Sequence, residues 1–208
     1  MKTRQDTTVS TVNAPLMKPM GIDEDSLPLL AEMLIRQYSN SLRSGIAETI
    51  ANGIDSHVAK GVTAPVRLST PDDLNPNVVI ADCGVGMSLQ TIEDVYTNFL
   101  ASSKRDSDDF TGHYGIGAKS LFAVTSSFTL VSVHDGVRQE VWLTRDESGA
   151  PVYAVLSTEA TDAPTGVTVT FPVPDPKAAR EAIAWIGKLM PAGALLIDGE
   201  PNESLLTE

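Results

Sequence analysis

In the first half of the chain, apolar positions recur every three or four residues, the spacing of helices with one buried face. Between these stretches lie two short apolar runs with the β-branched composition of strands. The predicted elements are, in order, helices at 26–38 and about 41–60, strands at 65–69 and 77–82, and helices at 88–100 and roughly 117–125.

From residue 127 the hydrophobic period changes to two, which indicates strands with one buried face. Helices first and a strand meander later favour an α+β fold, a two-layer sandwich of helices on a mixed, mostly antiparallel sheet. The predicted elements of this half are strands at 127–133, 139–145, 151–157 and 166–173, a helix at 177–190 and a short apolar run at 194–199.

Composition narrows the class of protein. The 208 residues are 42% hydrophobic and 20% charged, which suits a packed globular core. The net charge of −12 argues against general nucleic-acid binding. A single cysteine, Cys83, excludes an internal disulfide, and no apolar run suggests a signal peptide or membrane span. We therefore expect a cytoplasmic protein.

The chain is expected to divide into three parts. Residues 1–22 are rich in Thr, Ser and Val and carry two prolines, which indicates an arm or an edge strand. This segment either crosses to a second subunit or stays in its own sheet. Residues 23–175 form the main domain, and 176–208 a C-terminal helix with the start of a following domain.

The helix at 41–60 carries a polar triplet, Glu48, Asn52 and Asp55, on one side. One interpretation is a solvated outer face. The other is a general base beside a ligand for a hard cation, since a carboxylate and an amide oxygen lie one turn apart among small side chains. The triplet lies nearly opposite an apolar stripe of Leu42, Ile46, Ile50, Ile54 and Val58.

Two glycine loops follow. Asp82 ends an apolar strand, and Gly84, Gly86 and Met87 come next, so the segment is either a structural turn or a place where backbone approaches a flat ligand. The second loop, 112–120, opens a helix and would present backbone N–H groups and a lysine to an anion. It is not a P-loop, because Ala118 separates its last glycine from Lys119.

Taken in order, the motifs E-x-x-x-N-x-x-D, D-x-G-x-G-M and G-x-x-G-x-G-x-K-S resemble those of the GHKL ATPases, which include gyrase and the large heat-shock chaperones. A closer resemblance, over roughly 26–175, is to the N-terminal region of phage rIIA (rapid-lysis) proteins. It rests on the segments 46–61, 82–88, 99–122 and 165–173. The resemblance implies the Bergerat (GHKL) fold and the cofactors ATP and Mg²⁺.

The resemblance also implies roles for individual residues. Glu48 would activate water, Asn52 would bind Mg²⁺, and Asp55 would contact the nucleotide indirectly. Asp82 would accept a hydrogen bond from the adenine amino group, with Gly84, Gly86 and Met87 near the base. The lid would hold Ser102, Ser103 and Lys104, and the phosphates would lie against Gly112, His113, Tyr114, Gly115, Ile116, Gly117, Lys119 and Ser120.

Two departures from the family pattern stand out. Val167 follows the glycine of the late strand where many relatives have Thr, so Asp82 would be held by water or by Thr168. Many relatives also take a phosphate-sensing lysine from a following domain, whereas this chain ends at Glu208. We therefore expect either a truncated N-terminal piece or a short stand-alone protein, and slow turnover.

The expected function is an ATP hydrolase used as a conformational or dimerisation switch, with a homodimer formed through the N-terminal arm and lid. The alternative is a non-hydrolysing interaction module. A histidine kinase lacks support, because no phosphoacceptor helix precedes the domain. The rIIA resemblance implies host cytoplasm and a host-membrane-associated partner.

Overall fold

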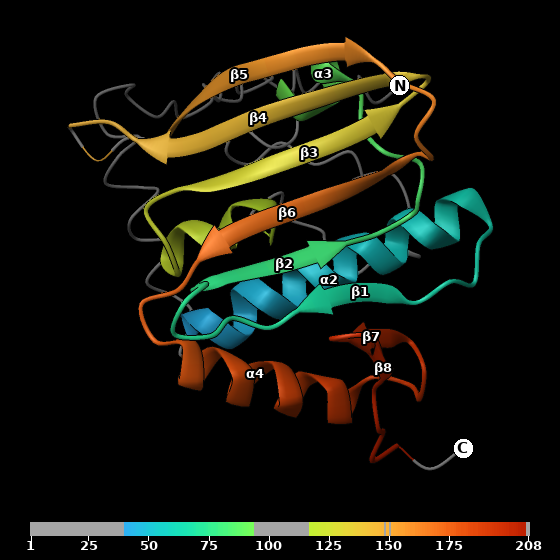
Figure 1. Ribbon diagram of the computed structural model, residues 1–208, viewed down its shortest axis with the longest axis vertical. Helices are drawn as coiled ribbons and strands as arrows, with labels where there is room; N and C mark the ends of the chain where they lie inside the picture. The colour runs from blue at the N-terminus through green and yellow to red at the C-terminus, as the bar shows by residue number, and fades with distance from the viewer. Residues whose placement is uncertain (1–39, 94–116, 148, 150, 207–208) are drawn as a thin grey trace, which may run out of the picture.

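The computed structural model describes residues 40–93, 117–147, 149 and 151–206 (Figure 1). Its helices are α2 (Ser41–Lys60), α3 (Leu89–Thr91), the 3-10 helix η3 (Gly117–Ala123) and α4 (Pro176–Leu189). Its strands are β1 (Val66–Ser69), β2 (Asn77–Ala81), β3 (Phe128–His134), β4 (Val137–Arg145), β5 (Pro151–Ala160), β6 (Gly166–Pro172), β7 (Leu195–Ile197) and β8 (Glu200–Pro201).

The described strands form one sheet in the order β5-β4-β3-β6-β2-β1-β7-β8. β1 and β7 run parallel, and the other neighbouring pairs run antiparallel. Figure 1 shows α2 crossing behind β2 and β1, with α4 alongside it. The structure confirms the predicted α+β fold with a mixed, mostly antiparallel sheet. Within the described ranges, no helix is long and apolar enough to cross a bilayer.

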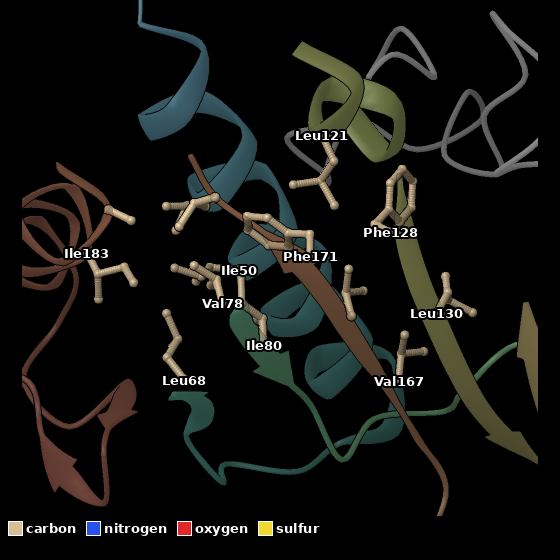
Figure 2. Packing of buried hydrophobic residues seen from close by; sticks show 14 of the residues in the cluster. Ile50, Leu68, Val78, Ile80, Leu121, Phe128, Leu130, Val167, Phe171 and Ile183 are labelled. Carbon is tan, nitrogen blue, oxygen red and sulfur yellow. The ribbon is translucent and has the colours of Figure 1, made fainter. Parts of the chain in front are cut away.

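The core lies between α2 and the sheet (Figure 2). Burial alternates along β2, β3 and β6, so one face of each strand supplies the apolar side chains. Ile50 on α2, Ile80 on β2 and Phe171 on β6 are buried together, and Ile183 on α4 extends the same cluster. The C-terminal segment also joins this layer, since β7 pairs with β1.

α2 has the predicted bounds, but its buried face differs from the predicted apolar stripe. The side chain of Val58 is 66% exposed, so that part of the prediction is wrong. Four residues outside the stripe, Gly45, Thr49, Gly53 and His57, are buried instead. Two of these are glycines: Gly53 lies against Val66 of β1 and Asp82, and Gly45 lies against η3, so the missing side chains let both neighbours approach the helix closely.

Two other predicted helices need comment. The helix expected over 117–125 is a 3-10 helix, whose three consecutive buried residues, Ser120, Leu121 and Phe122, do not suit an amphipathic α-helix. Ser88 caps α3 as expected, and its hydroxyl accepts a hydrogen bond from the Thr91 N–H. The described residues do not include 94–100 of that helix, the helix at 26–38 or the segment 1–22.

Candidate functional site

The polar triplet of α2 lies beside the end of β2. A Cβ on Gly53 would be 3.2 Å from Asp82 Cβ, so helix and strand end meet at this glycine. Asn52 directly precedes Gly53, and Glu48 and Asp55 lie about one helical turn before and after Asn52. All three triplet side chains are partly buried and take part in interactions within the chain. The structure thus brings together the first two predicted motifs.

Asp82 is held at the strand end by main-chain contacts. Its N–H donates to Val167 O at 2.9 Å, and its Oδ1 accepts from the Gly84 N–H at 2.8 Å. Burial raises the pKa of the Asp82 carboxyl above its ordinary value of 3.8, while the amides of Gly84 and Val167, then His57 and Lys60, act in the opposite direction. The result is a partly desolvated acceptor that suits an amino group of a ligand.

Side chains of α2 hold the first part of the loop 82–87. His57, which is 4% exposed, accepts a hydrogen bond at Nε2 from the Cys83 N–H at 2.8 Å. This bond requires the ring proton to be on Nδ1. Ser56 Oγ accepts from the Val85 N–H at 3.1 Å. The helix that carries the polar triplet therefore also positions the loop after Asp82.

Side chains of β3 hold the second part of the loop. The hydroxyl of Ser132, which is fully buried, accepts from the Met87 N–H at 2.7 Å and donates to Met87 O at 2.9 Å. His134 Nδ1 donates to Val85 O at 2.9 Å. Met87 is therefore fixed over the sheet by both of its main-chain polar groups.

The glycines of this loop are required by close packing. A Cβ on Gly84 would lie 2.5 Å from Ser56 Cβ, and a Cβ on Gly86, whose φ is +68°, would collide with Val133 O. A Cβ on Gly166 would collide with Asp82 O and lie 3.0 Å from Cys83 Cα. These contacts support the structural-turn interpretation, and the same turn leaves Asp82 in its half-buried position.

Thr168 was expected as a support for Asp82, but it lies on the other face of the sheet. It pairs with Ala81, and its buried neighbours Val167 and Val169 face α2. Because successive side chains of a strand alternate, Thr168 points away from α2. The β6 residue that hydrogen-bonds Asp82 is Val167, through its carbonyl oxygen.

The end of the second glycine loop lies against the first half of α2. A Cβ on Gly45 would be 2.8 Å from Val124 Cγ2 and 3.5 Å from Ser120 O, so η3 packs closely there, one turn before Glu48. Ser120 is buried, and the backbones of Gly117 and Lys119 lie in η3. The other predicted phosphate and lid residues lie outside the described part, namely Ser102, Ser103, Lys104, Gly112, His113, Tyr114, Gly115 and Ile116.

The supporting residues of the loop were not predicted. His57 and His134 are far apart in sequence and showed no metal-ligand spacing, yet both bind main-chain groups of this loop. Ser132 offered a usable signal, because it is a polar residue at a buried position of an apolar strand. For Ser56, the only sequence signal was that it directly follows Asp55.

The residues present fit ATP with Mg²⁺. Asp82 offers a partly desolvated acceptor of the kind that an adenine amino group would use. In the described part of the chain, no group of three or more His, Cys, Asp or Glu side chains could hold a metal. Mg²⁺ would therefore depend on Asn52, phosphate oxygens and water, an arrangement usual for nucleotide-bound Mg²⁺.

Comparison with known families matches residues 38–165 to the family described as histidine kinase-, DNA gyrase B-, and HSP90-like ATPase. The match covers more than half of the chain and includes α2, the loop 82–87 and η3. It agrees with the observed fold. The chain therefore belongs to the histidine kinase-, DNA gyrase B-, and HSP90-like ATPase family, as an ATP-binding module of the GHKL type.

Proposed function

We propose that the chain binds Mg·ATP between α2, the loop 82–87 and η3, and hydrolyses it slowly. The observation that carries the proposal is the half-buried Asp82 carboxyl group at the end of β2, which accepts from the Gly84 N–H and lies against Gly53 of α2. The acceptor lies against α2, the helix that carries Glu48 and Asn52 in its sequence.

In this proposal Asp82 accepts from the adenine amino group, with Gly86 and Met87 against the base. Glu48 takes the proton of the attacking water as the water oxygen bonds to the γ-phosphorus and the bond to the ADP oxygen breaks. Bound Mg²⁺ neutralises phosphate charge. Asn52 is its protein ligand, Asp55 a more distant contact, and the phosphates lie along 112–117 with Lys119 and Ser120 nearby.

We further propose that nucleotide acts as a switch. ATP closes a lid that contains Ser102, Ser103 and Lys104, and closure favours a homodimer in which residues 1–22 cross between subunits. The rIIA-like sequence features support a phage-encoded protein in host cytoplasm with a host-membrane-associated partner. The net charge of −12 supports partners other than nucleic acid.

Calorimetric titration of Mg·ATP tests the binding step. Wild type should bind saturably, and Asp82→Asn should not, because an amide that keeps its Oδ1 for Gly84 turns its NH₂ toward the adenine amino group. Asp73→Asn, a change at an exposed residue between β1 and β2, is the control and should bind like wild type. Equal affinity of wild type and Asp82→Asn would overturn the assignment of Asp82.

Steady-state phosphate release tests hydrolysis. Glu48→Gln should lower turnover about 10²- to 10⁴-fold while ATP still binds, since general base catalysis contributes a factor of this size. Glu181→Gln, an exposed change on α4, should leave turnover unchanged. Saturable binding with no turnover in wild type would instead favour a non-hydrolysing interaction module.

A further inference from the structure

Two side chains outside the family motifs hold two carbonyl groups of the loop 82–87. Lys60, in the last turn of α2, donates from Nζ to Cys83 O at 2.7 Å and to Thr165 Oγ1 at 2.8 Å. Thr165 in turn donates from Oγ1 to Gly84 O at 2.7 Å. Lys60 and Thr165 are 105 residues apart in sequence and form one connected network with the loop.

These bonds complete the hydrogen bonding of two consecutive peptide groups. In the peptide between Cys83 and Gly84, Lys60 holds the oxygen, and the N–H donates to Asp82 Oδ1. In the next peptide, Thr165 holds Gly84 O, and the Val85 N–H donates to Ser56. Each peptide plane is therefore fixed at both ends, so neither can rotate without breaking a bond.

The first of these planes determines the orientation of the Asp82 carboxylate. Its N–H is the donor that engages Asp82 Oδ1, at 2.8 Å. A rotation of the plane would carry this donor away and release the carboxylate. Lys60 also lies close enough to lower the pKa of Asp82, although burial has the larger, opposite effect.

We propose that Lys60 and Thr165 are positioning residues for nucleotide. They lock the two peptide planes after Asp82 and so set the affinity of the site for its adenine base. The inference rests on the proposed ATP binding, because it assigns Lys60 and Thr165 to the same site. Neither residue belongs to the three motifs, and neither is expected to touch the nucleotide.

Matched substitutions separate positioning from general packing. Thr165→Val removes the hydroxyl at nearly constant shape, whereas Thr165→Ser keeps it. In calorimetric titrations with Mg·ATP, Thr165→Val and Lys60→Met should bind about three- to tenfold more weakly than wild type. Thr165→Ser should stay within about twofold of wild type, as should Lys177→Met, the same charge change at an exposed site on α4.

Two results would overturn the proposal. One is wild-type affinity in Thr165→Val and Lys60→Met. The other is an equal loss in Thr165→Val and Thr165→Ser, since the hydroxyl would then be irrelevant.

Amide hydrogen exchange of the nucleotide-free protein separates this proposal from that of ATP binding. Thr165→Val should accelerate exchange of the Gly84 and Val85 amides relative to Thr165→Ser, because the planes that carry them are released. If wild type binds no ATP but this acceleration occurs, the proposed function fails and the locked loop stands. Unchanged exchange rates of these two amides in Thr165→Val would show that Thr165 does not fix the peptide planes, whether or not ATP binds.

Discussion

Asp82 carries a charge that its surroundings disfavour. Burial raises the pKa of its carboxyl, so the folded protein pays an energetic penalty when the group is ionised at neutral pH. The Gly84 amide and the charge of Lys60 reduce this penalty without removing it. A residue kept at such a cost is typical of a binding site, where stability is given up for recognition.

Asp82→Asn should therefore change stability in a pH-dependent way. A raised pKa in the folded state means that the neutral carboxyl is favoured below the ordinary value of 3.8, and that this advantage is lost as pH rises through the folded pKa. Asp82→Asn, which cannot ionise, should become more stable than wild type as pH rises from about 3 to 8. Urea unfolding at several pH values measures the difference, and an advantage that shrank with rising pH would contradict it.

Gly84→Ala should destabilise the protein by about 2–3 kcal/mol, the upper part of the range for overpacking. The added Cβ would lie 2.5 Å from Ser56 Cβ and 2.7 Å from its carbonyl carbon. Gly61→Ala is the control. It places Ala at a φ of +74° in open space, so the backbone conformation alone should lower stability, by about 1 kcal/mol. Thermal unfolding compares the two variants, and equal losses would contradict close packing at Gly84.

At the scale of elements, the loop 82–87 is held by hydrogen bonds from both α2 and β3. Ser56 and His57 reach it from the helix, and Ser132 and His134 reach it from the strand. Residues of the same two elements also pack in the core. The loop therefore keeps its shape only while α2 and β3 keep their relative positions.

Ser132→Ala tests the hydrogen bonds that β3 makes to the loop. Removing the hydroxyl leaves the partly buried Met87 N–H and C=O without their described partner, which should cost about 1–3 kcal/mol. Ser69→Ala, at an exposed position of β1, should change stability by less than about 0.5 kcal/mol. Urea unfolding gives both values. A Ser132→Ala loss as small as that of the control would mean that Met87 finds other partners.

At the scale of the whole molecule, the C-terminal segment and the sheet share one core. Ala179, Ile183 and Ile186 of α4 and Leu195 of β7 are almost fully buried in it. β7 continues the sheet beyond β1, and Asp198 accepts hydrogen bonds from the main-chain N–H and the hydroxyl of Thr70. The described part of 176–208 thus supports the strand that precedes β2 and Asp82.

A chain that ends at residue 175 should fail to fold cooperatively. Each large apolar side chain removed contributes about 1.5–3 kcal/mol, and their combined loss approaches the 5–15 kcal/mol of a typical domain. A chain that ends at Glu203 keeps α4, β7 and β8 and serves as the control. Urea unfolding followed by circular dichroism compares them. The shared core would be contradicted if the chain that ends at residue 175 unfolded cooperatively at the same urea concentration as the full-length chain.

Much of the fold follows from local patterns. Period-two runs predicted β3 to β6, and Ser88 predicted the start of α3, because side-chain alternation and capping depend on near neighbours. The bounds of α2 were predicted, but Val58 was misplaced. Periodicity says which residues share a face, not how far the sheet extends beneath that face.

The sequence by itself determined the α+β architecture, the Asp82 strand end and the membership of the ATPase family, since periodicity within each element and short motifs in a fixed order can be recognised without tertiary contacts. Only the tertiary structure decided what holds the loop after Asp82. Ser56, Ser132 and Thr165 come from separate elements and meet the loop only once the sheet has formed. Their partners are main-chain groups that every residue carries, so no local pattern could identify them.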